Sequence, residues 1–166
     1  MLTDNSVKWE VFQTSDFVCG RFSLEDWHLA VSDIDSDKEW AELLSENEDY
    51  ITCYILKNCS DNQPIAFLYT ILENEKEKIV SIHGGGWGKS MYLSLLYFRG
   101  VTLMLQNLWV QGFRVRTSCT VGNNRAYRFL QSIGFVKYRS THNYIYMWIN
   151  EKRLKGSRIY QHMYKE

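Results

Sequence analysis

The sequence lacks an excess of charge of either sign. It contains 19 basic and 19 acidic side chains among 166 residues, so its formal net charge is zero. Proteins that are drawn to nucleic acid or to anionic membranes by a global field carry a clear excess of positive charge. We therefore expect neither a nucleic-acid partner nor a membrane partner, and the partner has to be identified from a local site.

The sequence also lacks the features of a secretory signal. Residues 1–10 read MLTDNSVKWE, in which no basic start precedes an apolar run. The most apolar stretch, Met91 to Val110, is about as long as a membrane span, but it contains Arg99, Gln106 and Asn107. We interpret this stretch as a core helix and expect a cytoplasmic protein.

Cysteine and proline are scarce. The four cysteines form no CxxC pair and have no metal-ligand spacing with the four histidines, so we predict reduced thiols and no metal site. No proline- or glycine-rich linker divides the chain, which predicts one domain over residues 1–150. Residues 151–166 form a basic C-terminal extension that we expect to be solvated or to contact another subunit. A homodimer is an open alternative to a monomer.

The periodicity of apolar residues predicts an α+β (α/β) fold. Strand-like alternation or β-branched composition occurs at Trp9–Gln13, Tyr50–Leu56, Pro64–Leu72, Ile79–His83, Val115–Val121, Phe135–Ser140 and Tyr144–Asn150. Helical spacing predicts two short helices between residues 24 and 47, and two more at Met91–Gln111 and Asn124–Ser132. Gly134 follows the last helix in a position suited to a left-handed C-cap.

The most informative segment is rich in glycine. Ile82 to Ser90 reads IHGGGWGKS and places four glycines between a predicted strand and a long helix. Glycines let backbone N–H groups approach a ligand closely, and the N-terminus of a following helix adds unpaired donors and a favourable dipole for an anion. The segment therefore predicts a phosphate-binding cradle. Trp87 inside it either contacts a bound molecule or packs against the helix end.

The ligand of this cradle has more than one interpretation. Gly88, Lys89 and Ser90 match the end of a Walker A pattern, but His83 stands where its first glycine belongs. No apolar strand ends in an aspartate that would bind magnesium. A phosphate-loop nucleotide-binding protein is therefore the weaker alternative, and a glycine-rich turn without a ligand is another.

Two patterns in the chain resemble the GCN5-related N-acetyltransferase (GNAT) family. The pattern His83-x-x-Gly86-x-Gly88 resembles the pyrophosphate loop of the family, with His83 where Arg or Gln is usual. The stretch NNRAYRFLQSIGF resembles a second family signature at Asn123, Ala126, Gly134 and Phe135. The order and the separation of the two patterns agree with the family over about residues 64–150.

The resemblance implies a fold, an activity and a set of binding residues. It implies a GNAT-like fold with a mixed, mostly antiparallel, seven-stranded sheet flanked by about four helices. It also implies that the protein transfers an acetyl group from acetyl-CoA to an amine without a metal. The strands that carry Ile82 and Cys119 would part to admit the thioester arm, and strand N–H groups would stabilise the oxyanion. The implied coenzyme-binding residues are Ile82, His83, Gly84, Gly85, Gly86, Trp87, Gly88, Lys89, Ser90 and Asn123.

The candidate general base departs from the family. The family often has a carboxylate on the strand before the glycine-rich segment, but Ile79 to His83 contains none. His83 is the nearest titratable residue and the candidate base. Glu73 is a weaker candidate, and a packed or solvent-facing side chain is the simpler interpretation of His83.

The candidate general acid departs from it as well. The usual acid of the family is a tyrosine four residues after the motif alanine, and this position is Leu130. Tyr127 projects from nearly the same helix face and is the candidate acid, although core packing is the simpler role for it. Tyr144 and Tyr146 are further candidates.

No motif names the acceptor, which is a small-molecule or peptide amine. Residues 33–49 include eight acidic side chains against Lys38 alone, and the resemblance implies that the first helices wall the acceptor site. An acidic wall favours a cationic amine such as a polyamine, an aminoglycoside or a lysine side chain. A solvated helix face explains the same residues. Because of Leu130 and the missing carboxylate, a non-catalytic acyl-CoA-binding module is the alternative function.

Overall fold

The computed structural model describes residues 12–13, 17–22, 50–58, 64–86 and 91–164. The strands are β1 (Phe12–Gln13), β2 (Phe17–Phe22), β3 (Ile51–Asn58), β4 (Pro64–Asn74), β5 (Ile79–Gly86), β6 (Arg114–Thr120), β7 (Val136–Ser140) and β8 (Tyr144–Ile149). The helices are α3 (Met91–Val110), α4 (Asn124–Ile133), α5 (Glu151–Gly156) and α6 (Arg158–Met163).

The strands form an eight-stranded sheet in the order β1-β2-β3-β4-β5-β6-β8-β7. Neighbouring strands are antiparallel except for β5 and β6, which are parallel. The predicted mixed, mostly antiparallel fold is therefore confirmed, but the predicted count of seven strands is one too low. The missed strand is β2, whose sequence FVCGRF lacks a regular alternation of apolar and polar residues. The two helices predicted between residues 24 and 47 lie outside the described residues.

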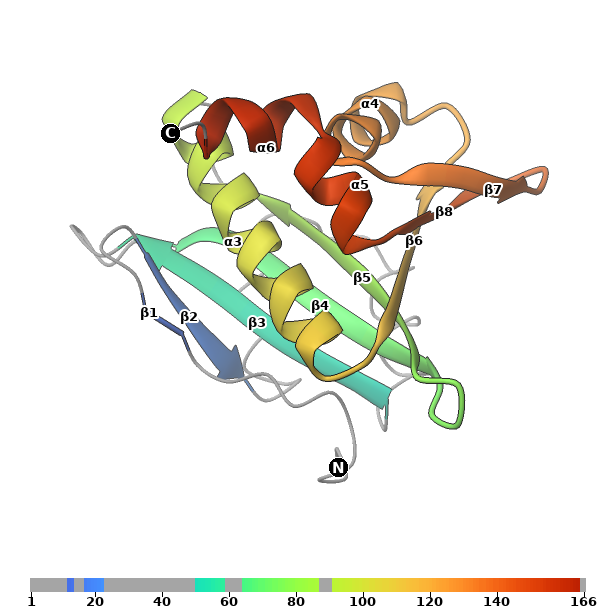
Figure 1. The fold of residues 1–166 in the computed structure, drawn as a ribbon, viewed down its shortest axis with the longest axis horizontal. Helices are drawn as coiled ribbons and strands as arrows, with labels where there is room; N and C mark the ends of the chain where they lie inside the picture. Colours follow the sequence, from blue (N-terminus) through green and yellow to red (C-terminus); the bar gives the residue numbers. More distant parts are fainter. Residues whose placement is uncertain (1–11, 14–16, 23–49, 59–63, 87–90, 165–166) are drawn as a thin grey trace.

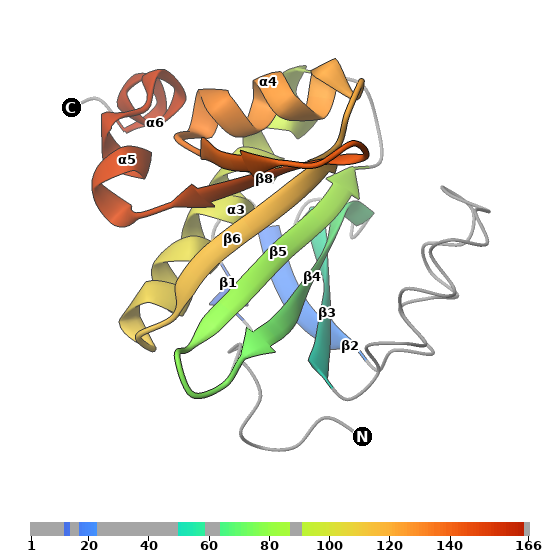
Figure 2. The ribbon, with the colours of Figure 1, turned by 90° about the vertical axis from the view of Figure 1, so that its right-hand side faces the viewer.

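Helix α3 covers one face of the sheet, as Figures 1 and 2 show. Successive residues of a strand point to opposite faces. Val80 and Ile82 of β5 belong to the same core cluster as Met104 of α3, so they face the helix. Ser81 and His83 therefore project from the opposite face of the sheet. None of the helices in the described ranges is long and apolar enough to cross a membrane.

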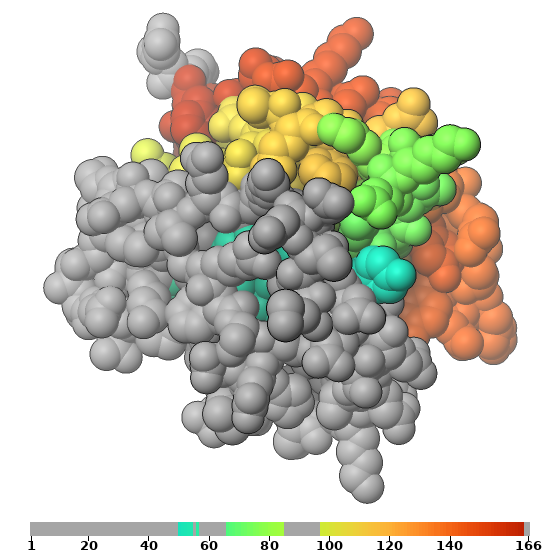
Figure 3. Space-filling view, turned by 90° about the horizontal axis from the view of Figure 1, so that it is seen from below, coloured from blue at the N-terminus to red at the C-terminus, as the bar shows by residue number. Residues whose placement is uncertain are grey.

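The turn between β4 and β5 is tied to the C-terminal end of α3. The backbone N–H of Arg114 donates to Lys78 O at 2.7 Å, and Lys78 Nζ donates to Gln111 O at 2.9 Å. The same ammonium lies 5.7 Å from the ring centroid of Phe113. Figure 3 shows the green atoms of this turn beside the gold end of α3. These contacts hold the start of β6 against the start of β5.

The predicted C-terminal extension forms two short helices: α5 contributes Leu154 to the core, and Ile159, Tyr160 and Met163 of α6 pack against it. Leu154 of α5 is 0% exposed and belongs to the core cluster. Gly134 has a φ of 112°, which confirms the predicted left-handed C-cap, and a Cβ at this position would lie 2.6 Å from Arg153 O. Lys152 and Lys155 are exposed. The basic composition of the segment gave no sign that Leu154 would be buried in the core.

Candidate active site

The pairing of β5 with β6 ends part-way along both strands. Ile79, Val80 and Ser81 pair with Arg114, Val115 and Arg116. Beyond these pairs, β5 continues to Gly86 and β6 to Thr120 without pairing to each other. Figure 1 shows the two strands diverging from the paired end. We call the paired part the closed half of the seam and the unpaired part the open half.

The open half is built into the sheet and is not a frayed end. On its outer edge β5 stays paired with β4 up to Gly86, and β6 stays paired with β8 up to Thr120. At the junction of the two halves, the buried hydroxyl of Thr117 donates to Ile82 O at 2.7 Å. The strands therefore part at Ile82, as the resemblance implies, but the residue opposite is Thr117 and not Cys119.

The open half presents a backbone donor. The N–H and C=O of one strand residue point to the same edge of the strand, and successive residues alternate between edges. The C=O of Ile82 points toward β6, because it accepts the hydrogen bond from Thr117. Gly84 lies two residues further along β5 and directs its N–H and C=O to that same edge, where β5 is no longer paired. A donor in such a place is suited to stabilising negative charge that develops on a ligand.

Glycine is required at position 84 by the approach of β4. A Cβ at Gly84 would clash with Phe67 O and would lie 2.7 Å from Leu68 Cδ2. A side chain would therefore push β5 away from β4 and displace the donor. The residue itself is exposed, so its backbone is accessible to a ligand.

His83 lies at the start of the open half, on the sheet face opposite α3. Its Nε2 is hydrogen-bonded to Ser81 Oγ at 3.0 Å, and its ring stacks on that of Tyr69 with centroids 5.0 Å apart. Burial lowers the pKa of His83 from 6.5 to about 4, because the charged form is poorly solvated there. The imidazole is therefore neutral at pH 7 and is a weak base in the free protein.

Asn123 begins α4 just beyond the open end of β6. Its Oδ1 accepts a hydrogen bond from the N–H of Ala126 at 3.2 Å and so caps the helix. The side chain is exposed, and capping uses its oxygen only. Capping leaves the amide NH₂ group of Asn123 unused.

The candidate acids occupy different surroundings. Tyr127 of α4 is half-buried and packs against the core cluster, which accounts for the residue without a catalytic role. Tyr144 and Tyr146 lie on β8 and pair with residues of the open half of β6. Glu73, the weaker candidate base, lies at the other end of the seam beside the β4–β5 turn.

Part of the glycine-rich segment lies outside the described residues, namely Trp87, Gly88, Lys89 and Ser90. The three preceding glycines, Gly84, Gly85 and Gly86, extend β5 as strand, so the predicted strand end at His83 is three residues too early. The chain leads from the open half directly to the N-terminus of the 20-residue helix α3. A helix N-terminus in this place is suited to binding phosphate.

Some residues of the site carry no signal in the sequence. Thr117 is an ordinary strand residue until the strands are placed side by side, because its partner Ile82 is 35 residues away along the chain. Ser81 lies on the same strand as its partner His83, in a segment where no pattern marks it. Cys119 lies in the open half, and burial raises the pKa of its thiol. Among the residues that the structure describes, no group of three or more His, Cys, Asp or Glu side chains is arranged to hold a metal ion.

Comparisons with known proteins find a structural match without a match in sequence. No protein-family model and no curated protein matches the chain. A GCN5-related N-acetyltransferase from Brucella melitensis superimposes with a TM-score of 0.68 at 11% identity, over 92% of this chain and 82% of that one. FdhC, a nucleotide-linked sugar GNAT, gives 0.59 at 16% identity, over 88% and 93%. A spermidine N-acetyltransferase from Vibrio cholerae, in a dodecameric structure, gives 0.61 at 10% identity, over 84% and 96%.

The chain has the GNAT fold. The resemblance inferred from the two sequence patterns is therefore confirmed at the level of the fold. In this GNAT fold the two patterns flank the open half of the seam, one at the end of β5 and the other at the end of β6. The seam is thus the place at which sequence and structure point to the same site.

Proposed function

We propose that the chain is a GNAT-family N-acyltransferase that binds acetyl-CoA at the open half of the seam. The observation that carries this proposal is the interruption of β5–β6 pairing while both outer ladders continue. The open half is bordered by the N–H of Gly84 and the amide of Asn123, which fit an acylated pantetheine arm with its hydrogen-bonding groups. The glycine-rich segment and the N-terminus of α3 would hold the phosphates of the coenzyme.

The Gly84 N–H supplies electrostatic stabilisation in this mechanism. When an amine nitrogen attacks the thioester carbon, the C–N bond forms, the C–S bond breaks, and the sulfur leaves as a thiolate that takes up a proton. Between the attack and the departure of the thiolate, negative charge develops on the carbonyl oxygen. A fixed N–H that points at this oxygen stabilises the transition state by about 3–4 kcal/mol. The acetyl group itself is supplied by the bound coenzyme.

The attacking amine must lose a proton, because an amine with a pKa near 10 is mostly protonated at pH 7. The candidate base His83 is neutral and lies at the start of the open half. Its pKa of about 4 makes it a poor proton acceptor in the free protein, so a base role for it requires the bound substrates to raise that pKa. The roles of His83 as base and of Tyr127 as acid stay predictions, and Tyr144 and Tyr146 are the alternative acids.

Direct transfer is favoured over an acyl-enzyme intermediate. The open half contains the Cys119 thiol, and burial raises its pKa. A thiol that stays protonated at pH 7 is a poor nucleophile. The acceptor amine therefore attacks the thioester itself.

The acceptor is an amine whose class the fold does not determine. The comparison structures include a spermidine N-acetyltransferase and a nucleotide-linked sugar GNAT, so cationic and anionic acceptors both occur on this fold. The acidic residues 33–49 that favour a cationic acceptor lie outside the described residues. A non-catalytic acyl-CoA-binding module is the second candidate, because a carboxylate on β5 and the usual acid tyrosine are both missing.

Thermal unfolding of the purified chain with acetyl-CoA, CoA, magnesium-ATP or buffer tests the coenzyme site. Acetyl-CoA at about a hundred times its Kd should stabilise the fold by about 2.7 kcal/mol, which is several degrees for a domain of this size. A shift with both CoA species and none with ATP supports the proposal. The absence of a shift with either CoA species contradicts it, and a shift with ATP alone supports the nucleotide-binding alternative.

Release of the CoA thiol in the presence of an amine panel then separates the enzyme from the binding module. An enzyme releases thiol in proportion to acetylated amine. Saturable coenzyme binding without release for any acceptor class, including polyamines, amino sugars, nucleotide-linked amino sugars and peptides, supports the module.

A further inference from the structure

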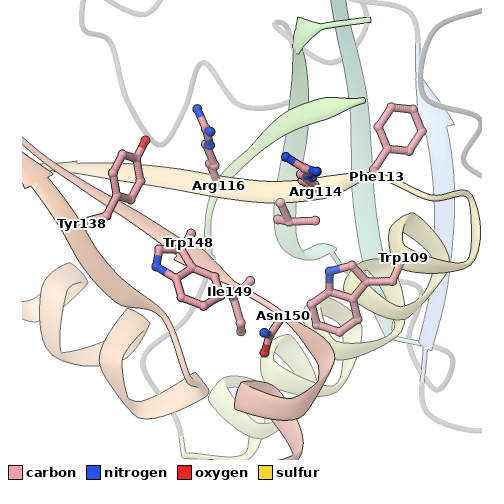
Figure 4. Close-up of a pocket in the computed structure, with 9 residues that line it drawn as sticks. Trp109, Phe113, Arg114, Arg116, Tyr138, Trp148, Ile149 and Asn150 are labelled. Atoms are coloured by element: carbon pink, nitrogen blue, oxygen red, sulfur yellow. The ribbon is translucent and has the colours of Figure 1, made fainter. Parts of the chain in front are cut away.

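A pocket of about 350 Å³ lies beside the closed half of the seam, where the end of α3 meets β6 and β8. Its volume falls within the range of about 300–1,000 Å³ that is typical of small-molecule sites. Figure 4 shows Arg114 and Arg116 projecting from the same side of β6, between the rings of Tyr138 and Phe113. The rings of Trp109 and Trp148, together with Val115, Ile149 and Asn150, also line the pocket.

Among the residues that the structure describes, no acidic side chain neutralises the two guanidinium groups of the pocket. Neither Arg114 nor Arg116 forms an ion pair with any residue that the structure describes, whereas Lys155 on α5 is paired with Glu151. The guanidinium of Arg116 lies 5.5 Å from the ring centroid of Tyr138, so charge and aromatic surface are held together. Flat rings beside guanidinium groups that form no ion pair with the described residues match a planar aromatic ligand that also carries phosphate or carboxylate.

Part of the pocket lining shares a sheet face with the proposed active site, while Val115 and Ile149 line the pocket from the face that packs on α3. Arg116 pairs with Ser81 across the parallel ladder and with Trp148 across the antiparallel ladder, so the three side chains share a face. Ser81 Oγ is hydrogen-bonded to His83 Nε2 at the start of the open half. From Arg114 to Thr117, where the open half begins, the distance along β6 is on the order of 10 Å.

We propose that this pocket binds the distal part of the acceptor, and that this part is a planar aromatic group bearing phosphate or carboxylate, as in a nucleoside diphosphate. The proposal rests on the proposed function, because the amine end of the same molecule would reach the open half. The rings stack on the aromatic group, and Arg114 and Arg116 bind the anion. The pocket thereby selects an anionic acceptor and not a polyamine.

Binding of uridine diphosphate (UDP) to the full chain tests this pocket. The chain is first saturated with CoA, so that the probe cannot occupy the coenzyme site, and binding is measured by calorimetry. UDP should bind to the CoA-loaded protein, and Arg114→Gln/Arg116→Gln should weaken it by about tenfold or more without changing the Kd for CoA. The matched control Lys76→Gln/Arg158→Gln removes the same charge at exposed positions and should change UDP binding by no more than about twofold.

The two parts of the probe test the two parts of the site. Uridine and pyrophosphate, each measured alone, should bind about tenfold or more weakly than UDP, because the rings and the guanidinium groups act on different ends of the ligand. Uridine binding as tightly as UDP overturns the role of the arginines. Pyrophosphate binding as tightly as UDP overturns the role of the rings. If the control variant weakens UDP binding as much as Arg114→Gln/Arg116→Gln does, the attraction is a non-specific effect of positive charge and the site is overturned.

Acceptor kinetics link the pocket to the reaction. A UDP-linked amino sugar should be acetylated with a higher kcat/KM than the free amino sugar, and Arg114→Gln/Arg116→Gln should remove that advantage. UDP binding without any such advantage identifies a separate effector and overturns the acceptor role. Failure of UDP to bind a protein that binds CoA overturns the pocket alone, whereas failure to bind CoA overturns the proposed function.

Discussion

The closed and open halves of the β5–β6 seam are made from the same two strands, yet different interactions hold them. In the closed half, three residue pairs and the contacts of Lys78 with Gln111 and Arg114 hold the strands together. In the open half, the outer edges of the strands stay paired with β4 and β8 while the inner edges do not pair. The neighbouring ladders therefore keep the gap open, and its backbone groups are left for a ligand.

The largest expected effect comes from filling the space at Gly84 in the open half. Gly84→Ala places a Cβ against Phe67 O and Leu68, so we expect the free energy of unfolding to fall by about 3 kcal/mol, and CoA binding to be lost with it. Urea denaturation and calorimetry measure the two effects.

Gly156→Ala is the matched control, because a Cβ there meets nothing within 4 Å. It should be neutral or should stabilise the protein by up to about 1 kcal/mol. Equal stability of the two variants would show that the approach of β4 to Gly84 does not constrain the open half.

The next effect concerns pH, because His83 titrates in the open half. Its pKa is about 4 in the folded protein and about 6.5 when unfolded, so the unfolded chain binds the proton more readily between these values. The free energy of unfolding should therefore fall as the pH is lowered from about 6.5 to 4, by on the order of 2 kcal/mol given partial solvent access, and should not change through this group above pH 7.

His83→Gln removes this titration, and urea denaturation at pH 7 and at pH 4.5 measures it. Between pH 7 and pH 4.5, the free energy of unfolding should fall more for the wild type than for His83→Gln. His142→Gln, at an exposed position, is the control. A difference that is the same at both pH values would contradict a lowered pKa at His83.

At the junction of the two halves, Thr117→Val removes the hydroxyl that donates to Ile82 O. The loss should destabilise the fold by about 1–2 kcal/mol, since a buried carbonyl loses its partner. It should also weaken CoA binding, because the bond fixes the edge of β5 that carries Gly84. Unchanged stability and unchanged CoA affinity would show that the bond does not set the geometry of the junction.

The smallest effect is expected on the outer ladder, with the opposite sign. Thr70 pairs with Ile82 and with Thr52, and the buried hydroxyls of both threonines lack a hydrogen-bond partner among the described residues. Thr70→Val keeps the shape and removes an unsatisfied polar group, so we expect a gain of up to about 1 kcal/mol in the free energy of unfolding. If Thr70→Val lowered the free energy of unfolding as much as Thr117→Val, the hydroxyls of Thr70 and Thr117 would contribute equally to stability, and the expected contrast would be wrong.

Local signals in the sequence predict helix α4 and its C-cap. Gly134 ends α4 as expected, because this kind of cap depends on neighbouring residues only, whereas the N-cap role of Asn123 was not predicted. Strand β2 and the packing of Leu154 were missed, because irregular alternation and basic neighbours obscure them.

The pocket could not be predicted at all. Its rings come from Trp109 on α3, Tyr138 on β7 and Trp148 on β8, which the packing of α3 on β6 and the pairing of β6 with β8 and of β8 with β7 bring together. The same holds for the Thr117 bond to Ile82. Long-range pairing, and not local composition, determines these parts of the site.

Amide hydrogen exchange with and without CoA tests the central claim most directly, since it reads both halves of the seam at once. Saturation with CoA should slow the exchange of peptides that cover Gly84 to Gly86 and Ser118 to Thr120, because the ligand occupies the open half. Peptides that cover Ile79 to Ser81 and Arg114 to Arg116 should be unchanged, because their pairing is already complete. Protection spread equally over both halves, or absent from the open half while CoA is bound, would contradict the account.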